Sequence, residues 1–250
     1  MSDNRYYSGT SGLLLPVPNK EFYPESFKTK SRLCYYGSLF NSIEINSSFY
    51  KVPLKKTVSR WAEETPANFK FTFKLWREIT HQKGLSFETA AVYDFIERIG
   101  AIGNKKACLL VQFPASIKFT HFRQLTNLLD CIRSADPDGL WRLAVEFRDR
   151  SWYREETYEL LEQYQAGSVL HDKITEGLQM TENGRDFIYV RFHGPNGDYK
   201  DSYNDDFLYE YASYIREWLA EGKQVYTYFN NTIGNAIGNL QILRNIVNEI

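Results

Sequence analysis

The sequence predicts an α/β fold of one domain, residues 1–250, built as a (β/α)₈ barrel. Eight short runs rich in β-branched and aromatic residues alternate with longer amphipathic segments, which is typical of βα units in a parallel sheet. A length of 250 residues suits one such barrel and its core. No GxGxxG motif follows the first run, which disfavours the main alternative, an open doubly wound sheet.

The predicted strands are short and regularly spaced along the chain. In order they are RYYSGTS (5–11), SIEIN (42–46), KFTFKLW (70–76), ACLLVQF (107–113), RLAVEFR (142–148), GSVLHD (167–172), FIYVRFH (187–193) and QVYTYFN (224–230). Amphipathic periodicity predicts helices over 87–103, 120–133, 155–165, 205–222 and 236–250. The sixth unit is the weakest, because residues 172–186 leave little room for a full helix.

Composition limits the classes of partner. Thirty Lys and Arg residues nearly balance 31 Asp and Glu residues, so no global basic charge indicates a nucleic-acid binder. The three cysteines are widely spaced in apolar segments without a CxxC pair, which favours core residues in a reducing compartment. The N-terminus lacks a signal pattern, and no apolar run approaches the roughly 20 residues of a membrane span. We therefore expect a soluble cytoplasmic protein; the sequence gives no oligomeric state.

Polar residues fall on one face of the predicted strands. Because side chains alternate across a strand, Ile43 and Ile45 share the face toward the helices, while Glu44 shares the inner face with Asn46. The same split recurs in the other strands, mostly near their carboxyl ends, where barrel enzymes assemble their sites. The inward polar ring comprises Glu44, Asn46, Lys74, Gln112, Glu146, Arg148, Asp172, Arg191, His193, Tyr228 and Asn230.

Such a ring has two interpretations. Barrel interiors sometimes hold networks of charged side chains that only fill space and fix the register of the strands. However, so many polar groups at one end would cost too much desolvation to serve packing alone. The ring as a whole therefore favours a ligand site.

The chain resembles the YecE-like barrel family, a domain of unknown function (DUF72). The motifs that carry the resemblance are GTSG (9–12), FYP (22–24), FNSIEINSSFY (40–50), WAEETPANFKFTFK (61–74), ITH (79–81), LLVQFPAS (109–116), AVEFRDRSW (144–152), RFHG (191–194) and YFNN (228–231). The resemblance implies a (β/α)₈ barrel over most of the chain. It implies no activity, because the family has none that is settled.

The ring suggests acid/base chemistry. Glu44 and Glu146 lie on opposed strands, and two opposed carboxylates are the groups used in glycoside hydrolysis or proton transfer. The competing interpretation is that Glu146 pairs with Arg148 or Lys74 and that Arg191 holds Glu44. His193 and His81 are the candidate groups that titrate near neutral pH. His171 has the wrong parity for the interior, and His121 opens a helix, so both are expected to be structural.

Cations in the ring favour an anionic ligand. Arg148, Arg191 and Lys74 would repel a metal ion, so no metal or cofactor is predicted. A divalent metal on Glu44, Glu146, Asp172, His81 and His193 is the minority interpretation. Glycines 194, 197 and 234, in the loops after the last two strands, could let the backbone approach a phosphate, and Asn231 or Thr232 could cap the last helix.

These observations predict an enzyme, a hydrolase or an isomerase, that acts on a small anionic sugar- or nucleotide-like substrate. The predicted catalytic residues are Glu44, Glu146 and His193; the predicted substrate-binding residues are Asn46, Lys74, His81, Gln112, Arg148, Trp152, Asp172, Arg191, Tyr228, Asn230 and Asn231. Two alternatives stay open: a metal-assisted phosphodiesterase or nuclease, and a non-catalytic barrel that binds nucleic acid.

Overall fold

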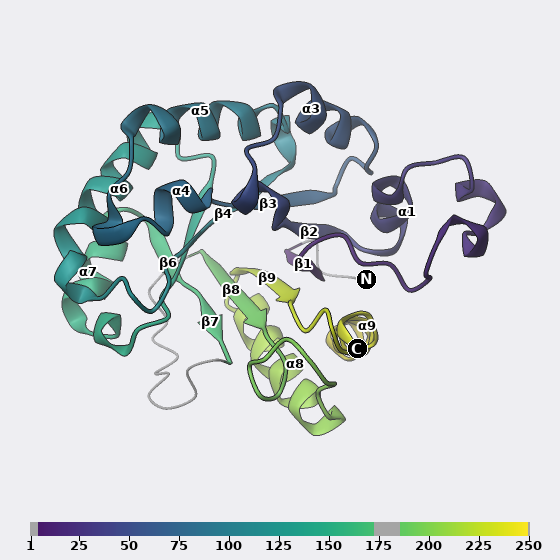
Figure 1. The fold of residues 1–250 in the computed structure, drawn as a ribbon. Coiled ribbons are helices and arrows are strands. Elements are labelled where there is room, and N and C mark those ends of the chain that lie inside the picture. Colours follow the sequence, from purple (N-terminus) through teal and green to yellow (C-terminus); the bar gives the residue numbers. More distant parts are fainter. Residues whose placement is uncertain (1–4, 173–185, 250) are drawn as a thin grey trace.

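The computed structural model describes residues 5–172 and 186–249 (Figure 1). Within these residues the chain alternates strands and helices. The strands are β1 (Tyr6–Thr10), β2 (Ser42–Ile45), β3 (Lys70–Lys74), β4 (Lys106–Gln112), β5 (Arg142–Glu146), β6 (Ala166–Ser168), β7 (Leu170–His171), β8 (Phe187–Phe192) and β9 (Gln224–Phe229). The helices are α1 (Arg32–Leu39), α2 (Ser47–Tyr50), α3 (Lys55–Glu63), α4 (Arg77–Thr80), α5 (Thr89–Gly100), α6 (Phe122–Ala135), α7 (Glu155–Gln163), α8 (Asp205–Ala220) and α9 (Ala236–Asn248), with short 3₁₀ turns between some of them.

All the paired strands run parallel, in two sheets. One has four strands in the order β1-β9-β8-β7, and the other has five in the order β2-β3-β4-β5-β6. The α/β class with parallel strands is therefore confirmed, whereas a single closed eight-stranded barrel is not. The predicted strand over 167–172 is divided at Val169 into β6 and β7, which belong to different sheets.

The two sheets meet at both ends of the strand order. Ser11, just after β1, forms a parallel bridge with Glu44 of β2, and the Gly12 amide donates to the Glu44 carbonyl at 2.8 Å. At the other end only Val169 separates β6 from β7, and its amide donates to the Val145 carbonyl of β5 at 2.9 Å. Each sheet edge is thus held close to an edge of the other.

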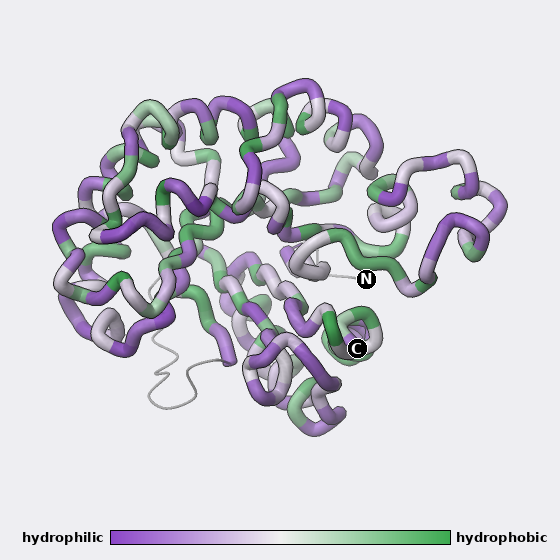
Figure 2. Tube along the Cα trace, viewed as in Figure 1, coloured by the Kyte–Doolittle hydropathy of each residue, from purple (hydrophilic) through white to green (hydrophobic). Residues whose placement is uncertain are grey.

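Alternation across the strands places the core as the sequence predicts. Ile43, Phe71, Leu143 and Val190 belong to the large cluster that packs under the helices. A second buried cluster lies between the sheets; its members are Ala107, Cys108, Leu110, Ala144, Val169, Phe187, Tyr189, Tyr226 and Tyr228. Figure 2 shows purple and green alternating along the outer helices, as expected for amphipathic helices with one buried face.

The predicted helices are confirmed, with shifts of a few residues at their ends. Four further helices among the described residues, α1 to α4, lie outside the predicted helical ranges. Helix α1 begins where the Ser31 hydroxyl accepts from the Cys34 amide, and α8 begins where the Asn204 side chain accepts from the Phe207 amide. The weak helical prediction for the sixth unit, over 172–186, falls almost wholly outside the described residues. Among the helices described, none is long and apolar enough to cross a bilayer.

Candidate functional site

Three fully buried charged groups form the centre of the site: Glu44 of β2, Glu146 of β5 and Arg191 of β8. The Arg191 guanidinium donates from Nη2 to Glu44 Oε1 at 2.8 Å and from Nη1 to Glu146 Oε2 at 2.6 Å. Their side chains are 0%, 0% and 1% exposed. One guanidinium of the four-stranded sheet thus joins two carboxylates of the five-stranded sheet.

The charges in this centre stabilise one another. Burial alone would raise the pKa of Glu146, but Arg191 and Arg148 outweigh burial and hold that pKa well below its ordinary value. Burial would lower the pKa of Arg191, but Glu146 and Glu44 raise it above the ordinary value of an arginine. Glu146 therefore stays ionised near neutral pH and has no proton to donate. Its predicted role as a catalytic acid finds no support in this geometry.

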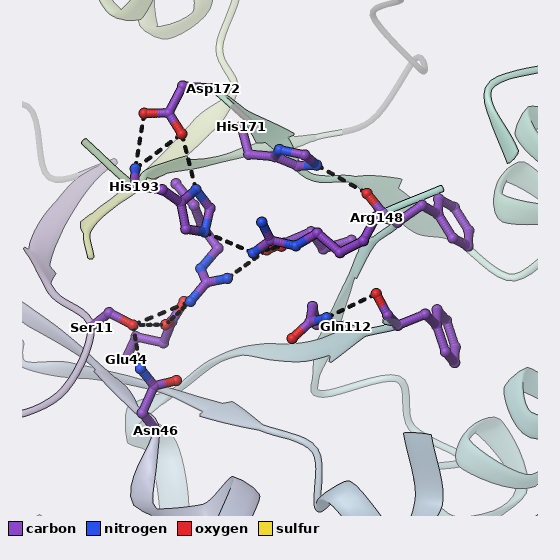
Figure 3. A network of polar contacts seen from close by, with 12 residues as sticks. Ser11, Glu44, Asn46, Gln112, Arg148, His171, Asp172 and His193 are labelled. Atoms are coloured by element: carbon purple, nitrogen blue, oxygen red, sulfur yellow. Dashed lines mark hydrogen bonds and ion pairs between the residues drawn. The ribbon is translucent and has the colours of Figure 1, made fainter. Parts of the chain in front are cut away.

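Glu44 is surrounded by further donors. The Tyr189 and Ser11 hydroxyls both donate to its carboxylate. Asn46 Nδ2 in turn donates to Ser11 Oγ at 2.6 Å, and Figure 3 shows the contacts of Ser11 with Glu44 and Asn46. Arg191 Nη2 also lies 3.2 Å from Ser11 Oγ. The Asn46 amide oxygen is buried and has no hydrogen-bond partner among the described residues. Asn46, which is partly exposed, therefore presents a free acceptor beside the network.

On the other side, the network continues through Arg148 to a buried histidine. Arg148 forms an ion pair with Glu146, and its Nη2 donates to His193 Nε2 at 2.9 Å. His193 Nδ1 lies 3.0 Å from Asp172 Oδ1, and the Tyr203 hydroxyl donates to the same carboxylate. Burial lowers the pKa of His193 to about 4, so the ring is neutral, with its proton on Nδ1 toward Asp172. In this arrangement His193 orients Arg148.

The structure corrects the assignment of His171. Its parity predicts a position outside the interior, but it pairs in register with Arg191 of β8, and paired residues of parallel strands face the same side. His171 is 2% exposed, and its ring lies 5.8 Å from the His193 ring, centroid to centroid. The inward phase of β7 therefore falls on 171, whereas Asp172 reaches His193 from just beyond the end of the strand.

Lys74 ends β3 and is partly exposed. Its Nζ lies 4.2 Å from the centre of the Phe49 ring, a cation–π contact. Among the described residues the Lys74 ammonium forms no ion pair and no hydrogen bond. Burial and the charge of Arg191 lower the pKa of Lys74 to about 8, although Glu146 and Glu44 act in the opposite direction.

His81 contacts the same aromatic ring. The His81 and Phe49 rings are 4.7 Å apart, edge to face, and His81 Nδ1 is 2.8 Å from the Thr80 hydroxyl oxygen. Burial and the charge of Lys74 lower the pKa of His81 to about 4, so His81 is neutral at neutral pH. The partly neutral amine of Lys74 and the neutral imidazole of His81 thus both contact the Phe49 ring.

Two inward residues stand apart from this network. Gln112 donates from Nε2 to the Phe113 carbonyl at 2.8 Å, and Figure 3 shows it separate from the chain of contacts around Glu44. The Tyr228 hydroxyl lies 2.6 Å from Ser42 Oγ and 2.9 Å from Thr72 Oγ1, deep between the sheets. Each is a register neighbour of a residue of the charged centre, Gln112 of Glu146 and Tyr228 of Arg191, but neither side chain forms a hydrogen bond with that centre in the described structure.

The remaining predicted binding residues serve packing or loop contacts. The Trp152 ring is fully buried and stacks on Phe147 at 4.6 Å. Asn231 is fully buried and donates to the Asn239 side chain at 3.0 Å instead of capping α9. Asn230, which follows β9, is partly exposed, and its backbone amide donates to the last carbonyl of β8 at 2.7 Å.

The glycines of the last two loops bring the loops together. A Cβ on Gly194 would lie 2.4 Å from the Lys200 carbonyl oxygen, and Gly194 has a φ of +100°. A Cβ on Gly234 would lie 2.1 Å from the Asp201 carbonyl oxygen. Close approach of one backbone to another therefore explains these glycines without a phosphate.

Sequence reasoning missed Ser11, Tyr189 and Tyr203, which complete the network. Ser11 lies in the GTSG motif at the end of the first strand, and that position is the signal that could have found it. Tyr189 shares its inward face with Arg191, two residues later. Among the described residues, no group of three His, Cys, Asp or Glu side chains is placed to hold a metal ion.

Comparisons with known proteins agree with the fold. A family model described as "Protein of unknown function DUF72" matches residues 7–249. UPF0759 protein YunF of Bacillus subtilis is 28% identical over 244 residues, covering 85% of this chain and 84% of that protein. UPF0759 protein YecE of Escherichia coli K12 is 30% identical over 118 residues, 47% of this chain and 42% of that protein.

Solved structures of the same kind are similar over nearly the whole chain. A DUF72 family protein of Enterococcus faecalis V583 aligns with a TM-score of 0.80 at 20% identity, covering 98% of this chain and 96% of that one. A DUF72 family protein of Thermotoga maritima MSB8 aligns with a TM-score of 0.70 at 25% identity, covering 98% and 99%. The descriptions of these proteins name no reaction.

Proposed function

Because this chain belongs to the DUF72 family of proteins of unknown function, whose description assigns no reaction, we propose its function from the charged side chains that end its strands. The chain is an enzyme that acts on a small anionic molecule of the phosphorylated sugar or nucleotide class. Arg148 and Lys74 hold the anion, and Lys74 is the group that transfers protons. We also propose that the two sheets close into one (β/α)₈ barrel, with the site at the carboxyl ends of the strands.

The closed barrel is supported by the contacts at the two seams. The Ser11–Glu44 bridge joins the first strands of the two sheets, and a single residue, Val169, lies between β6 and β7. Side chains from both sheets share the inner cluster, and Arg191 reaches two strands of the other sheet. A crystal structure with a backbone gap at either seam would contradict closure.

The observation that carries the functional proposal is the unpaired ammonium of Lys74. The two buried glutamates form ion pairs with Arg191 and Arg148. No carboxylate of the described residues lies within ion-pairing distance of Lys74. With Asp172 counted, the three cations Lys74, Arg148 and Arg191 balance the three carboxylates of the network, but of these cations only Lys74 lacks an ion pair among the described residues. A ligand that brings negative charge would pair with its ammonium.

Proton transfer fits Lys74 better than it fits the glutamates. A general acid or base works best when its pKa lies near the working pH, and the pKa of Lys74 is about 8. Glu44 and Glu146 are 0% exposed, and each is bound by a guanidinium. We therefore assign the two glutamates to orienting the arginines. The metal-assisted alternative lacks a suitable donor cluster in the described residues, and no contact favours a nucleic-acid surface.

A thermal-shift screen tests this proposal. Phosphosugars, nucleotides and inorganic phosphate are compared with neutral sugars on the native chain, on Arg148→Gln and on Arg123→Gln, a matched control on the exposed surface of α6. A ligand at a hundredfold excess over its Kd stabilises by about 2.7 kcal/mol, which is about 5–10 °C for a chain of this length. We expect this shift in the native chain and the control, and its loss in Arg148→Gln. Equal shifts in all three would reject the site.

A further inference from the structure

Lys74 occupies an unusual position among the cations of the site. Arg148 and Arg191 each face a carboxylate, whereas the Lys74 Nζ faces the Phe49 ring at 4.2 Å. Lys74 is the last residue of β3, which lies between β2 and β4. It is partly exposed, at the edge of the buried network. A lysine that served only to fill this space would be expected to pair with a carboxylate.

The charges that face Lys74 come from β2, β8 and the end of β5. Arg191 of β8 and Arg148, just after β5, repel a proton on the amine, and Glu44 of β2 and Glu146 of β5 partly offset them. Desolvation against an aromatic face and neighbouring cations are the two conditions that make a lysine amine nucleophilic. Both conditions are met here, and the pKa of Lys74, lowered to about 8, follows from them.

A second titratable group contacts the same ring. His81 packs edge to face on Phe49 and is neutral, and its Nδ1 is engaged by Thr80 at 2.8 Å. The second ring nitrogen of His81 has no hydrogen-bond partner among the described residues, and the ring is partly exposed. It can therefore exchange a proton with a group bound at Lys74.

We propose that Lys74 forms an imine with the carbonyl carbon of a small anionic aldehyde or ketone whose charged group is held by Arg148. The inference rests on the proposed function and names its substrate class. The neutral amine attacks the carbonyl carbon and forms the C–N bond, and the two protons of its nitrogen pass in turn to the carbonyl oxygen. The C–O bond then breaks as the C=N bond forms, and the oxygen leaves as one water for each imine formed. No oxidant or reductant is consumed.

The amide oxygen of Asn46 offers a further contact for the substrate. It is a buried acceptor without a hydrogen-bond partner among the described residues, and Asn46 follows β2, the strand next to that of Lys74. A hydroxyl group on the substrate would satisfy it. The substrate class is therefore a carbonyl compound with one anionic group and one hydroxyl group within a few atoms.

Reductive trapping tests the inference. The native chain is incubated with glyceraldehyde 3-phosphate, which carries a carbonyl, one hydroxyl and one phosphate group, reduced with sodium borohydride, and analysed by peptide mass spectrometry. At pH 8 an amine with a pKa near 8 is half neutral, whereas an ordinary lysine is roughly 0.4% neutral, a difference of about 100-fold. Allowing for restricted access, we expect the Lys74 peptide to be labelled at least about tenfold faster than that of Lys55, an exposed lysine paired with Glu97.

The controls separate this inference from the proposed function. Lys74→Arg keeps the positive charge but has no amine, and Lys55→Arg is the matched surface variant. We expect phosphate to stabilise both variants, and labelling of the major site to disappear only in Lys74→Arg. Anion binding without a Lys74 adduct in the native chain would overturn the imine and leave the proposed function standing. Absence of any anion-dependent shift would instead overturn the proposed function.

The native chain provides a test that needs no variant. The rate of labelling at Lys74 should rise as pH increases and level off above about pH 8.5, and inorganic phosphate should slow it by occupying the site. Labelling that is spread over lysines in proportion to their exposure, or that phosphate does not slow, would contradict the inference.

Discussion

Replacement of Arg191 by methionine tests the energetics of the buried centre. The guanidinium is 1% exposed and is the only cation in an ion pair with Glu44 among the described residues, whereas Glu146 keeps Arg148. In Arg191→Met, Glu44 must stay charged without a cation or take up a proton. Protonating an ordinary glutamate at pH 7 costs about 3.7 kcal/mol, because pH 7 is about 2.7 units above its ordinary pKa of about 4.3. This agrees with the loss of about 3–5 kcal/mol typical of a broken buried ion pair.

The sign of the pH dependence follows from the same proton. The folded variant binds a proton that its unfolded chain releases, so its stability relative to the native protein increases as the pH falls. At pH 5 the cost of protonation is only about 1 kcal/mol. The native chain is unaffected over this range by Glu146, whose low pKa keeps it ionised in the folded state. The difference between the two proteins should therefore shrink from about 3–4 kcal/mol at pH 7 to about 1 kcal/mol at pH 5.

Urea unfolding of four proteins measures this effect: the native chain, Arg191→Met, the double variant with Glu44→Gln, and Lys55→Met. The double variant removes the stranded charge, so it should recover most of the stability at pH 7 and lose the pH dependence. Lys55→Met breaks a largely exposed ion pair with Glu97 and should cost less than about 1 kcal/mol. A loss below about 1 kcal/mol for Arg191→Met at pH 7, or an equal loss at both pH values, would show that water reaches Glu44 and would refute the reasoning.

Two further predictions concern the loops and the buried histidine. Gly234→Ala should destabilise the chain by about 1–3 kcal/mol in the same unfolding assay, because the added Cβ would collide with the Asp201 backbone. Gly100→Ala is the control: an added Cβ there has nothing within 4 Å, and it should stabilise α5 by about 0.4–1 kcal/mol. Equal effects of the two substitutions would contradict the loop contact. His193 should titrate in NMR spectra near pH 4, since burial lowers its pKa. Its contribution to stability is then fully present above about pH 6.5 and declines as the pH falls toward 4; a midpoint near 6.5 would mean that the ring is solvated.

Local alternation predicted the charged ring because it depends only on neighbours along one strand. Ile43 and Ile45 fix the phase of β2, so Glu44 had to point inward, and Arg191 follows from Val190 and Phe192 in the same way. The sixth strand gave an ambiguous phase, because Val169 and Leu170 are adjacent apolar residues, and the phase assigned to it wrongly placed His171 outside the interior.

Partner choice could not be predicted from one strand at a time. Whether Glu146 pairs with Lys74, Arg148 or Arg191 depends on the distance between strands that are far apart in the sequence. Both the Arg148 and the Arg191 pairs form, and Lys74 is left without one. The sequence likewise left open that the glycines of the last loops let the backbone approach a phosphate, whereas Gly194 lies against the Lys200 backbone and Gly234 against the Asp201 backbone.

The ion pair between Arg191 and Glu44, which are far apart in the sequence, imposes an order on folding. The Arg191 contact with Glu44 spans 147 residues of sequence, and the Tyr189 contact with the same carboxylate spans 145. During synthesis, the strands β1 to β6 emerge before Arg191, the cation that forms the ion pair with Glu44 in the described structure. The amino-terminal half therefore cannot bury its own centre without a stranded charge. Commitment to the folded state must wait for β8, so the same guanidinium that organises the site also makes late completion of the chain a condition of stability.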